Sequence, residues 1–153
     1  MADTGSLRMV AVSKETFEDL LPMVADYQRF YEIKDIDAER NRRFFGRLLE
    51  APDEGVQFLC YQDEKAVGFV TLFFPLSSTR AARFALMNDL YVDPLARGRG
   101  VGRALIEKAR AVASARGFKD LSWMTATDNK RAQMLYDSFP ATRTRWIEYC
   151  LAE

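Results

Sequence analysis

The sequence predicts an α/β fold in which a mixed, largely antiparallel sheet is flanked by helices. Strand-like apolar runs alternate with amphipathic helical stretches, in the expected order β-α-α-β-β-β-α-β-α-β. Two of these runs are joined by a short polar turn, as in a β-hairpin. With 153 residues, 48% hydrophobic and 29% charged, the chain has an ordinary globular composition without repeats or linkers. We therefore expect one domain over residues 1–153, with residues 1–6 as a frayed tail.

The first part of the chain is expected to form one strand and two helices. Residues 7–12 have the pattern of a strand, and Ser13 can cap an amphipathic helix that ends near residue 31. Pro22 lies within this stretch, so the helix either starts late or kinks there. A second helix is expected over residues 37–50, with Asp37 as its cap, before "APDEG" ends it.

The middle of the chain predicts a hairpin, a strand and a long helix. The hairpin is "VQFLCYQDEKAVGFVTLFF", residues 56–74, in which Gly68 marks a bulge or a close packing contact. Residues 84–92 form the next expected strand. Residues 101–116 have an apolar stripe at helical spacing, and Gly117 is the expected stop.

The last part of the chain predicts two further strands around a short helix. Residues 121–125 are expected to form a strand, and residues 129–138 a helix that Pro140 cannot continue. Residues 146–151 have the pattern of a final strand, and a short extra strand near residues 141–143 is a further option.

The overall charge and hydropathy exclude several classes of partner. Lys and Arg together number 22, as do Asp and Glu, so the whole surface does not attract nucleic acid or anionic lipid. The apolar runs are too short to span a membrane. The start "MADTGSL" lacks the basic and apolar regions of a signal peptide, so we expect a cytoplasmic protein.

The cysteine and histidine content limits the chemistry. Cys60 and Cys150 lie in apolar strand-like runs, which predicts buried free thiols and neither a disulfide nor a metal site. Histidine is absent, which excludes a Ser-His-Asp triad, a Cys-His dyad and the usual zinc-histidine sites. In an enzyme, protons would move through carboxylates, tyrosine, cysteine, lysine or water.

A glycine-rich turn joins a strand to a helix in "LYVDPLARGRGVGRALIEKA", residues 90–109. Its glycines are Gly98, Gly100 and Gly102, and its arginines are Arg97, Arg99 and Arg103. Glycines let an anion approach the unpaired N–H groups at a helix start, and arginine supplies donors for phosphate oxygens. The spacing is that of neither G-x-G-x-x-G nor a P-loop. The turn predicts a pyrophosphate site, and a tight turn with solvated arginines is the alternative.

Two motifs in this order resemble the GNAT superfamily of acetyl-CoA-dependent N-acetyltransferases. The first, Arg/Gln-x-x-Gly-x-Gly/Ala after an "LYV-x-P" strand end, stands here as Leu90-Tyr91-Val92-Asp93-Pro94 and Arg97-Gly98-Arg99-Gly100-Val101-Gly102. The second, Asn-x-x-Ala-x-x-Leu-Tyr, stands here as Asn129, Ala132, Leu135 and Tyr136. The resemblance spans nearly the whole chain and implies the GNAT fold, with about four helices around the sheet.

The resemblance implies a binding site for acetyl-CoA as the cosubstrate, without a metal. Main-chain N–H groups of residues 97–103, namely Arg97, Gly98, Arg99, Gly100, Val101, Gly102 and Arg103, would hold the pyrophosphate. Leu90, Tyr91 and Val92 would bind the pantetheine arm, with the backbone of Leu90 and Val92 pairing with it like an added strand. Asn129 would bond this arm or the loop around it, although it can also act as a helix cap.

Tyr136 matches the tyrosine that usually protonates the departing thiolate in this family. A thiol has a pKa near 8.5 and a phenol near 10, so a neutral phenol within hydrogen-bond reach can protonate the sulfur. The alternative is a core aromatic, because Ala132, Leu135 and Tyr136 share one helical face.

Asp89 is the candidate group that receives the proton of the acceptor amine, directly or through water. Polyamine acetyltransferases of the superfamily have a Glu-Asp pair where this chain has Asn88-Asp89, so the resemblance implies that Asp89 holds a substrate ammonium group. The alternative is a carboxylate at a strand end or on the surface. The stretch "YQRFYEIKDIDAER" adds acids and aromatics that suit an ammonium ligand, or that form a solvated loop with core aromatics.

The resulting prediction is an N-acetyltransferase for a small cationic amine that works by direct attack in a ternary complex. A protein acetyltransferase for lysine or an N-terminus, and a non-catalytic acyl-CoA-binding regulator, are the alternatives. An acyl-cysteine at Cys60 is disfavoured because nothing near it in sequence would lower its pKa. We expect a homodimer, since family members often dimerise through their C-terminal strands, and Trp123, Trp146 and Tyr149 are predicted core or interface residues.

Overall fold

The computed structural model describes residues 5–153 and is built around a five-stranded sheet with the order β1-β2-β3-β6-β7. The strands are β1 (Leu7–Ala11), β2 (Gly55–Gln62), β3 (Lys65–Phe73), β6 (Ala85–Val92) and β7 (Leu121–Ser122). The first four pair antiparallel, whereas β7 runs parallel to β6. This confirms the predicted mixed and mostly antiparallel sheet. The predicted tail, residues 1–6, falls mainly on residues 1–4, outside the described part of the chain.

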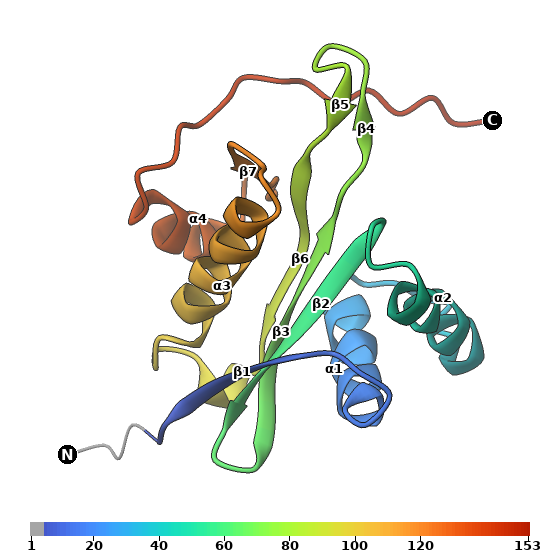
Figure 1. The fold of residues 1–153 in the computed structure, drawn as a ribbon, viewed down its shortest axis with the longest axis vertical. Helices are drawn as coiled ribbons and strands as arrows, with labels where there is room; N and C mark the ends of the chain where they lie inside the picture. Colours follow the sequence, from blue (N-terminus) through green and yellow to red (C-terminus); the bar gives the residue numbers. More distant parts are fainter. Residues whose placement is uncertain (1–4) are drawn as a thin grey trace.

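Two pairs of helices cover the two faces of this sheet (Figure 1). The helices are α1 (Phe17–Phe30), α2 (Ala38–Glu50), α3 (Val101–Ala115) and α4 (Lys130–Asp137). Helices α1 and α2 pack on one face and form an apolar core around Leu20, Leu59 and Phe69. Helix α3 packs on the other face over a second core that includes Val70 and Leu105. The sheet is therefore the middle of three layers, in which each helical layer buries its own apolar stripe.

The first helix begins later than its predicted cap. Thr16 precedes α1, and its Oγ1 accepts a hydrogen bond from the backbone N–H of Ser13 at 2.9 Å. The helix therefore starts later than a cap at Ser13 would place it. Pro22 nevertheless lies inside the helix, on its exposed side. The second helix begins as predicted, because the Asp37 side chain accepts the N–H of Arg40 at 2.9 Å.

Three short elements were not predicted. A small hairpin of β4 (Leu76–Ser77) and β5 (Ala82–Arg83) extends the β3–β6 connection beyond the main sheet (Figure 1). A single 3-10 turn, η1 (Pro94–Ala96), links β6 to the glycine loop, and the Asp93 side chain accepts the N–H of Leu95 at 2.9 Å. These elements are too short for hydrophobic periodicity to reveal them.

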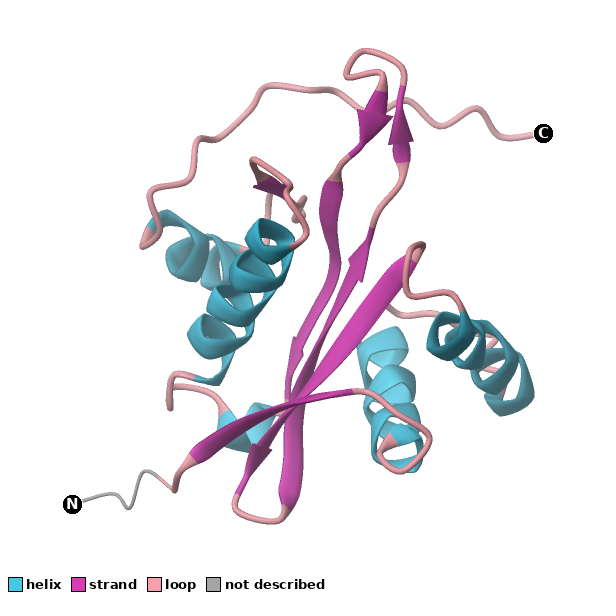
Figure 2. Ribbon diagram, viewed as in Figure 1, coloured by secondary structure: helices cyan, strands magenta, loops and turns pink. Residues whose placement is uncertain are grey.

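The predicted C-terminal strand, residues 146–151, is wrong for this structure. Residues 140–153 form neither helix nor strand, and all of them are exposed (Figure 2). Trp146 and Tyr149 are therefore not core residues, and Cys150 is exposed whereas Cys60 is buried as predicted. Strand β7 is also shorter than its predicted range, 121–125. A strand needs a partner edge for its backbone hydrogen bonds, and the apolar pattern of a segment does not supply that partner.

Candidate functional site

The glycine loop forms an open cradle of backbone amides at the start of α3. Gly98 and Gly100 have φ of 77° and 82°, and a Cβ at either position would meet nothing within 4 Å. Gly100 is the residue before the helix and offers no side-chain cap. The first amide bonded within the helix is that of Ala104, which donates to the Gly100 carbonyl at 3.0 Å. The N–H groups of residues 101–103 therefore lie in the first turn, where the helix dipole favours an anion.

The three arginines of the loop have different surroundings. Arg97 is half-buried, and its Nε donates to the backbone carbonyl of Val92 at 3.2 Å, which ties the loop to the end of β6. Arg103 lies over the ring of Phe139 and donates to Ser138 Oγ at 2.6 Å, so its side chain joins α3 to the end of α4. Arg99 is exposed. Of the three side chains, that of Arg99 is best placed for a mobile contact with a phosphate group.

Close packing fixes the cradle against the sheet. A Cβ at Gly68 would lie 2.7 Å from the carbonyl oxygen of Tyr91 and 3.2 Å from Val101 Cγ1. A Cβ at Gly102 would lie 2.9 Å from Leu135 Cδ2 of α4. The two glycines thus allow β3, α3 and α4 to approach one another closely at the point where the open amides lie.

Strand β6 has one paired edge and one that is largely open. It pairs with β3 from Phe73↔Leu86 to Gly68↔Val92, except at Asn88. On the other side it pairs with β7 only at Ala85↔Leu121 and Leu86↔Ser122. Beyond these pairs, the backbone of residues 87–92 faces the gap where β6 and β7 diverge, so this edge can bind an extended, amide-containing chain.

A bulge in β6 changes the face of the sheet on which the side chains that follow it lie. Thr71 pairs with Asp89 and Leu72 with Met87, so Asn88 is an extra residue without a partner. Met87 lies in the α3 core, whereas Tyr91 is buried in the α1 core. The ring of Tyr91 therefore cannot line the open edge, and only its backbone remains available for the cofactor role predicted from sequence.

Asp89 is the end of a polar stripe that crosses the sheet on the α1 side. In register across three strands lie Gln57, Thr71 and Asp89. Gln57 Nε2 donates to Thr71 Oγ1 at 2.8 Å, which leaves the Thr71 hydroxyl to donate to Asp89. Asn88 Nδ2 donates to Asp89 Oδ1 at 3.1 Å, and the Tyr27 hydroxyl also bonds this carboxylate. Asp89 is thus held by a network and is not a free surface carboxylate.

Burial shifts the pKa values of both Asp89 and Tyr27. It raises the pKa of Asp89 above the ordinary carboxyl value, and the hydrogen bonds from Thr71, Tyr27 and Asn88 only partly oppose this. Burial also raises the pKa of Tyr27, with Asp89 adding to the shift, so the phenol stays protonated and can donate. A partly desolvated carboxylate of raised pKa is a stronger base and a better partner for an ammonium group.

Tyr136 lies on α4 and is half-buried. Its ring packs edge-on against Trp123, with ring centroids 5.5 Å apart. Burial raises its pKa, and Tyr31 adds to the shift. Tyr31 in turn contacts Tyr27, with ring centroids 5.0 Å apart. The two candidate catalytic residues are thus linked through neighbouring tyrosines, from Asp89 through Tyr27 and Tyr31 to Tyr136.

Asn129 and the acids of the α1–α2 loop have structural roles. The Asn129 side chain accepts the N–H of Ala132 at 3.2 Å and so caps α4, as the alternative from sequence stated. Asp37 caps α2, and Asp35 pairs with Arg40 at 3.0 Å. All the acids in this loop are exposed, so they do not form an enclosed binding site.

Sequence reasoning missed Thr71 and Gln57, which hold Asp89 in place. A signal was present, because both are polar residues within the otherwise apolar hairpin, where a buried polar side chain needs a hydrogen-bond partner. Cys60 is buried, and burial raises the pKa of its thiol to about 11. This strengthens the prediction that Cys60 is not an acyl carrier.

Among residues 5–153, His, Cys, Asp and Glu side chains form no cluster of three or more that could hold a metal ion. None of the helices in this range has the length and apolar character needed to cross a bilayer.

Comparisons with known proteins agree with this geometry. The model of the acetyltransferase (GNAT) family matches residues 20–139. Over 133 residues the chain is 30% identical to YhfO of Bacillus subtilis, an uncharacterized N-acetyltransferase, with 86% of this chain and 88% of YhfO covered. It is 28% identical over 133 residues to a thialysine N-epsilon-acetyltransferase of Caenorhabditis elegans, covering 87% and 81% of the two chains.

A solved structure shows the same architecture. The crystal structure of a probable acetyltransferase superposes with a TM-score of 0.82 at 28% identity, and the match covers 95% of this chain and 97% of the other. The family match, the relatives and the open helix start beside a free strand edge all agree. The chain therefore belongs to the GNAT family of acetyl-CoA-dependent N-acetyltransferases.

Proposed function

We propose that residues 1–153 act as one domain that transfers the acetyl group of acetyl-CoA to the primary amine of a small cationic molecule. The observation that supports this acceptor class most strongly is the half-buried carboxylate of Asp89, which three neutral donors hold on the α1 side of the sheet. Neutral donors leave the negative charge of a carboxylate uncompensated, so an ammonium group is a suitable ligand. A relative named a thialysine N-epsilon-acetyltransferase is consistent with this class.

The cosubstrate is proposed to bind along the glycine loop and the open edge of β6. The amides of residues 97–103 would hold the diphosphate, with the exposed Arg99 adding charge. The backbone of Leu90 and Val92 would pair with the amides of the pantetheine arm. Their side chains pack toward the α3 core, which is consistent with a requirement for apolar side chains alone.

The transfer is a single displacement within a ternary complex. The acceptor ammonium first loses a proton to Asp89, directly or through water, and the neutral nitrogen then attacks the thioester carbonyl carbon. The new C–N bond forms as the C–S bond breaks, and the thiolate takes its proton from the phenol of Tyr136. The nitrogen loses its second proton as the neutral amide forms, and this proton returns through water to the phenolate of Tyr136. The raised pKa values of Asp89 and Tyr136 suit both roles, because one group must accept a proton and the other must still carry one at neutral pH.

A panel of acceptors tests the substrate class. Release of free thiol from acetyl-CoA is measured with polyamines, aminoglycosides, amino acids of both charges and lysine-containing peptides. We expect the highest kcat/KM with small amines that carry a second positive charge. A preference for peptides would favour a protein acetyltransferase, and tight acetyl-CoA binding without thiol release for any amine would favour a regulator; either result would overturn the proposal.

A charge reversal tests the cosubstrate site. Arg99→Glu should raise KM for acetyl-CoA by about tenfold, because a carboxylate would then face the phosphates. Arg43→Glu is the matched control, since Arg43 is equally a surface arginine but lies on α2, across the sheet. Equal KM values for the two variants would place the phosphates elsewhere. The cytoplasmic location and the homodimer expected from sequence stay predictions.

A further inference from the structure

Two buried polar side chains lie next to each other on the α1 side of the sheet and take no direct part in the proposed transfer. Gln57 of β2 and Thr71 of β3 pair across the hairpin, and they are 5% and 0% exposed. Burying polar groups costs free energy, and an apolar pair of the same shape would pack there about as well. Stability alone therefore does not account for this buried polar pair.

The hydrogen bond between the two side chains fixes the direction of the Thr71 hydroxyl. Gln57 Nε2 donates to Thr71 Oγ1 at 2.8 Å, so the hydroxyl oxygen is occupied from one side. A hydroxyl carries one hydrogen, and an ionised carboxylate only accepts. In the strand register Thr71 lies opposite Asp89, and its hydroxyl bonds that carboxylate. The single hydrogen of the Thr71 hydroxyl therefore points at Asp89.

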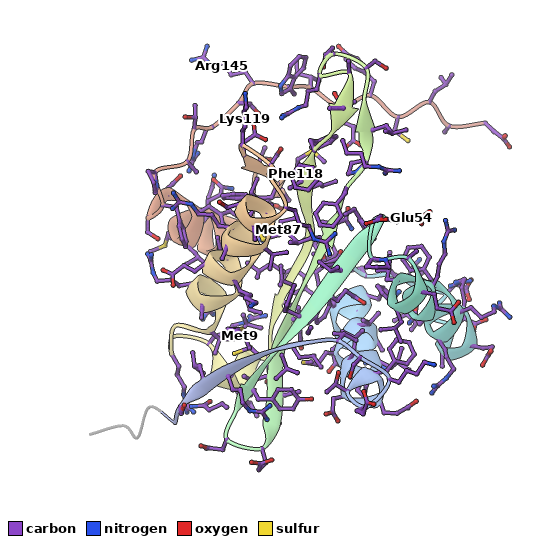
Figure 3. The ribbon with its side chains drawn as sticks, viewed as in Figure 1. Met9, Glu54, Met87, Phe118, Lys119 and Arg145 are labelled. Atoms are coloured by element: carbon purple, nitrogen blue, oxygen red, sulfur yellow. The ribbon has the colours of Figure 1, made fainter. Side chains whose placement is uncertain are left out.

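The bulge at Asn88 brings Asp89 onto the same face as the buried polar pair, whereas Met87 of β6 lies on the opposite face, toward α3 (Figure 3). Asp89 accepts hydrogen bonds from Thr71, Tyr27 and Asn88, none of which is charged. A carboxylate offers about four acceptor positions, so about one remains for a ligand. The three donors thus limit the direction from which Asp89 can take a proton from an ammonium group.

Of these three donors, Thr71 is the one that solvent cannot replace. Asn88 is exposed, so water would take over its hydrogen bond. Tyr27 is half-buried and reaches Asp89 from the helical layer. Thr71 is fully buried, and its strand is held between β2 and β6. Loss of its hydroxyl would therefore leave Asp89 with an acceptor position that nothing else fills.

We propose that Gln57 and Thr71 are positioning residues for the acetyl transfer: Gln57 aims the Thr71 hydroxyl, and this hydroxyl keeps Asp89 ionised and turned toward the acceptor ammonium. The inference rests on the proposed function, in which Asp89 takes the proton of the acceptor. Both residues act through Asp89 and touch neither substrate. The buried polar pair thereby sets the lowest pH at which the protein uses a cationic amine.

Removal of the Thr71 hydroxyl has an effect of defined sign. Burial raises the pKa of Asp89 and the hydrogen bond from Thr71 lowers it, so loss of this bond raises the pKa further. The titratable groups on the α1 side are the phenols of Tyr27 and, beside it, Tyr31, and Tyr27 stays protonated because its own pKa is raised. The strands next to Asp89 present the neutral side chains of Thr71 and Gln57.

The first experiment follows the Asp89 carboxyl by NMR across pH and measures the pH profile of kcat/KM for a diamine acceptor. Thr71→Val keeps the shape of the side chain and removes the hydroxyl. We expect the Asp89 titration and the acid limb of the profile to move together to higher pH by about one unit, as for loss of a hydrogen bond to a charged group. KM for acetyl-CoA should not change. Thr71→Ser keeps the hydroxyl and should keep the native profile.

Two further variants separate positioning from a purely structural role. Val70→Ala is the matched control, because Val70 precedes Thr71 on β3, is equally buried and lies in the α3 core. It should lower Tm without moving the Asp89 titration. Gln57→Met removes the donor to Thr71 and should move the titration in the same direction as Thr71→Val, but by less. Added to Thr71→Val it should move the titration no further, because both changes act through one hydroxyl.

An Asp89 titration that Thr71→Val leaves at its native pH would overturn the proposal, as would additive shifts from Gln57→Met and Thr71→Val. If Thr71→Val does not fold, Gln57→Met decides the matter, and an unmoved titration in that variant overturns the proposal. An unmoved titration in a chain that acetylates cationic amines would contradict this inference alone. A shifted titration in a chain that acetylates no cationic amine would contradict the proposed function alone.

Discussion

A single methyl group at Gly68 tests how closely the start of α3 must approach the sheet. Gly68→Ala would place a Cβ 2.7 Å from the Tyr91 carbonyl oxygen, 3.1 Å from Leu105 Cδ1 and 3.2 Å from Val101 Cγ1. The first contact is with backbone that belongs to the β3–β6 ladder, so it cannot be relieved by a side-chain rotation. Overpacking of this kind costs about 1–3 kcal/mol, and the lower entropy of the unfolded alanine chain offsets about 0.4–1 kcal/mol.

The net loss of about 1–2 kcal/mol corresponds to a fall in Tm of about 2–8 °C for a chain of this size. KM for acetyl-CoA should rise as well, because Val101 is the first residue of α3 and moves when the contact is relieved. Calorimetry and steady-state kinetics measure the two effects. Gly46→Ala is the matched control: its Cβ would meet only the ring of Phe17, at 3.7 Å from Cζ and 4.0 Å from Cε1, and alanine favours the α2 helix by up to about 1 kcal/mol. Equal increases in Tm for the two variants would refute the close approach.

Four further substitutions, of which Gly117→Ala is a control, test the individual roles. Gly100→Ala and Gly117→Ala place alanine at φ of 82° and 85° with no steric contact, so both should lose about 1–2 kcal/mol of stability, but only the former should raise KM for acetyl-CoA. Tyr136→Phe should lower kcat about 10²-fold with KM for acetyl-CoA nearly unchanged, and an unaltered kcat in stopped assays would reduce Tyr136 to a packing role. Asp89→Asn should weaken the use of cationic amines. The pKa of Asp89 is raised in the folded protein, so its protonated form stabilises the native state at low pH, and this stability is lost as pH rises through the raised pKa. The Tm of the Asn variant should therefore increase relative to that of the native protein as pH rises above the ordinary carboxyl range. A Tm difference that is constant with pH would contradict the burial of the carboxylate.

The elements with strong periodic patterns were predictable from sequence, and those that depend on a distant partner were not. The α3 stripe and the hairpin of β2 and β3 fall close to their expected residues, because a single chain segment encodes each pattern. The pattern of residues 146–151 is equally clear, yet the segment is exposed, because strand formation also depends on an available edge. The cap at Asp37 was predictable since its hydrogen bond is local, to Arg40.

In the candidate site, too, the features that depend on local sequence were predictable and those that depend on distant residues were not. The positive φ of Gly98 and Gly100 followed from residue type at a strand-to-helix turn. The side chain of Arg103 did not follow, because its partners Ser138 and Phe139 are 35 and 36 positions away in sequence and adjoin it only through the packing of α4 on α3. The raised pKa of Asp89 also depends on its burial among residues of α1, β2 and β3, and no sequence motif predicts that burial.

Under the proposed function, the bulge at Asn88 lets one strand contribute to the sites of both substrates. In a regular strand Met87, Asp89 and Tyr91 would share a face, and Asp89 would enter the α3 core beside Met87, where a carboxylate has no partner. The extra residue reverses the alternation between Met87 and Asp89, so Asp89 meets Thr71 and Tyr27 on the α1 side while Leu90 and Val92 remain on the α3 side. The proposed acceptor carboxylate of Asp89 and the side chains of Leu90 and Val92, whose backbone is the proposed cofactor edge, are therefore adjacent in sequence or nearly so but lie on different sides of the sheet.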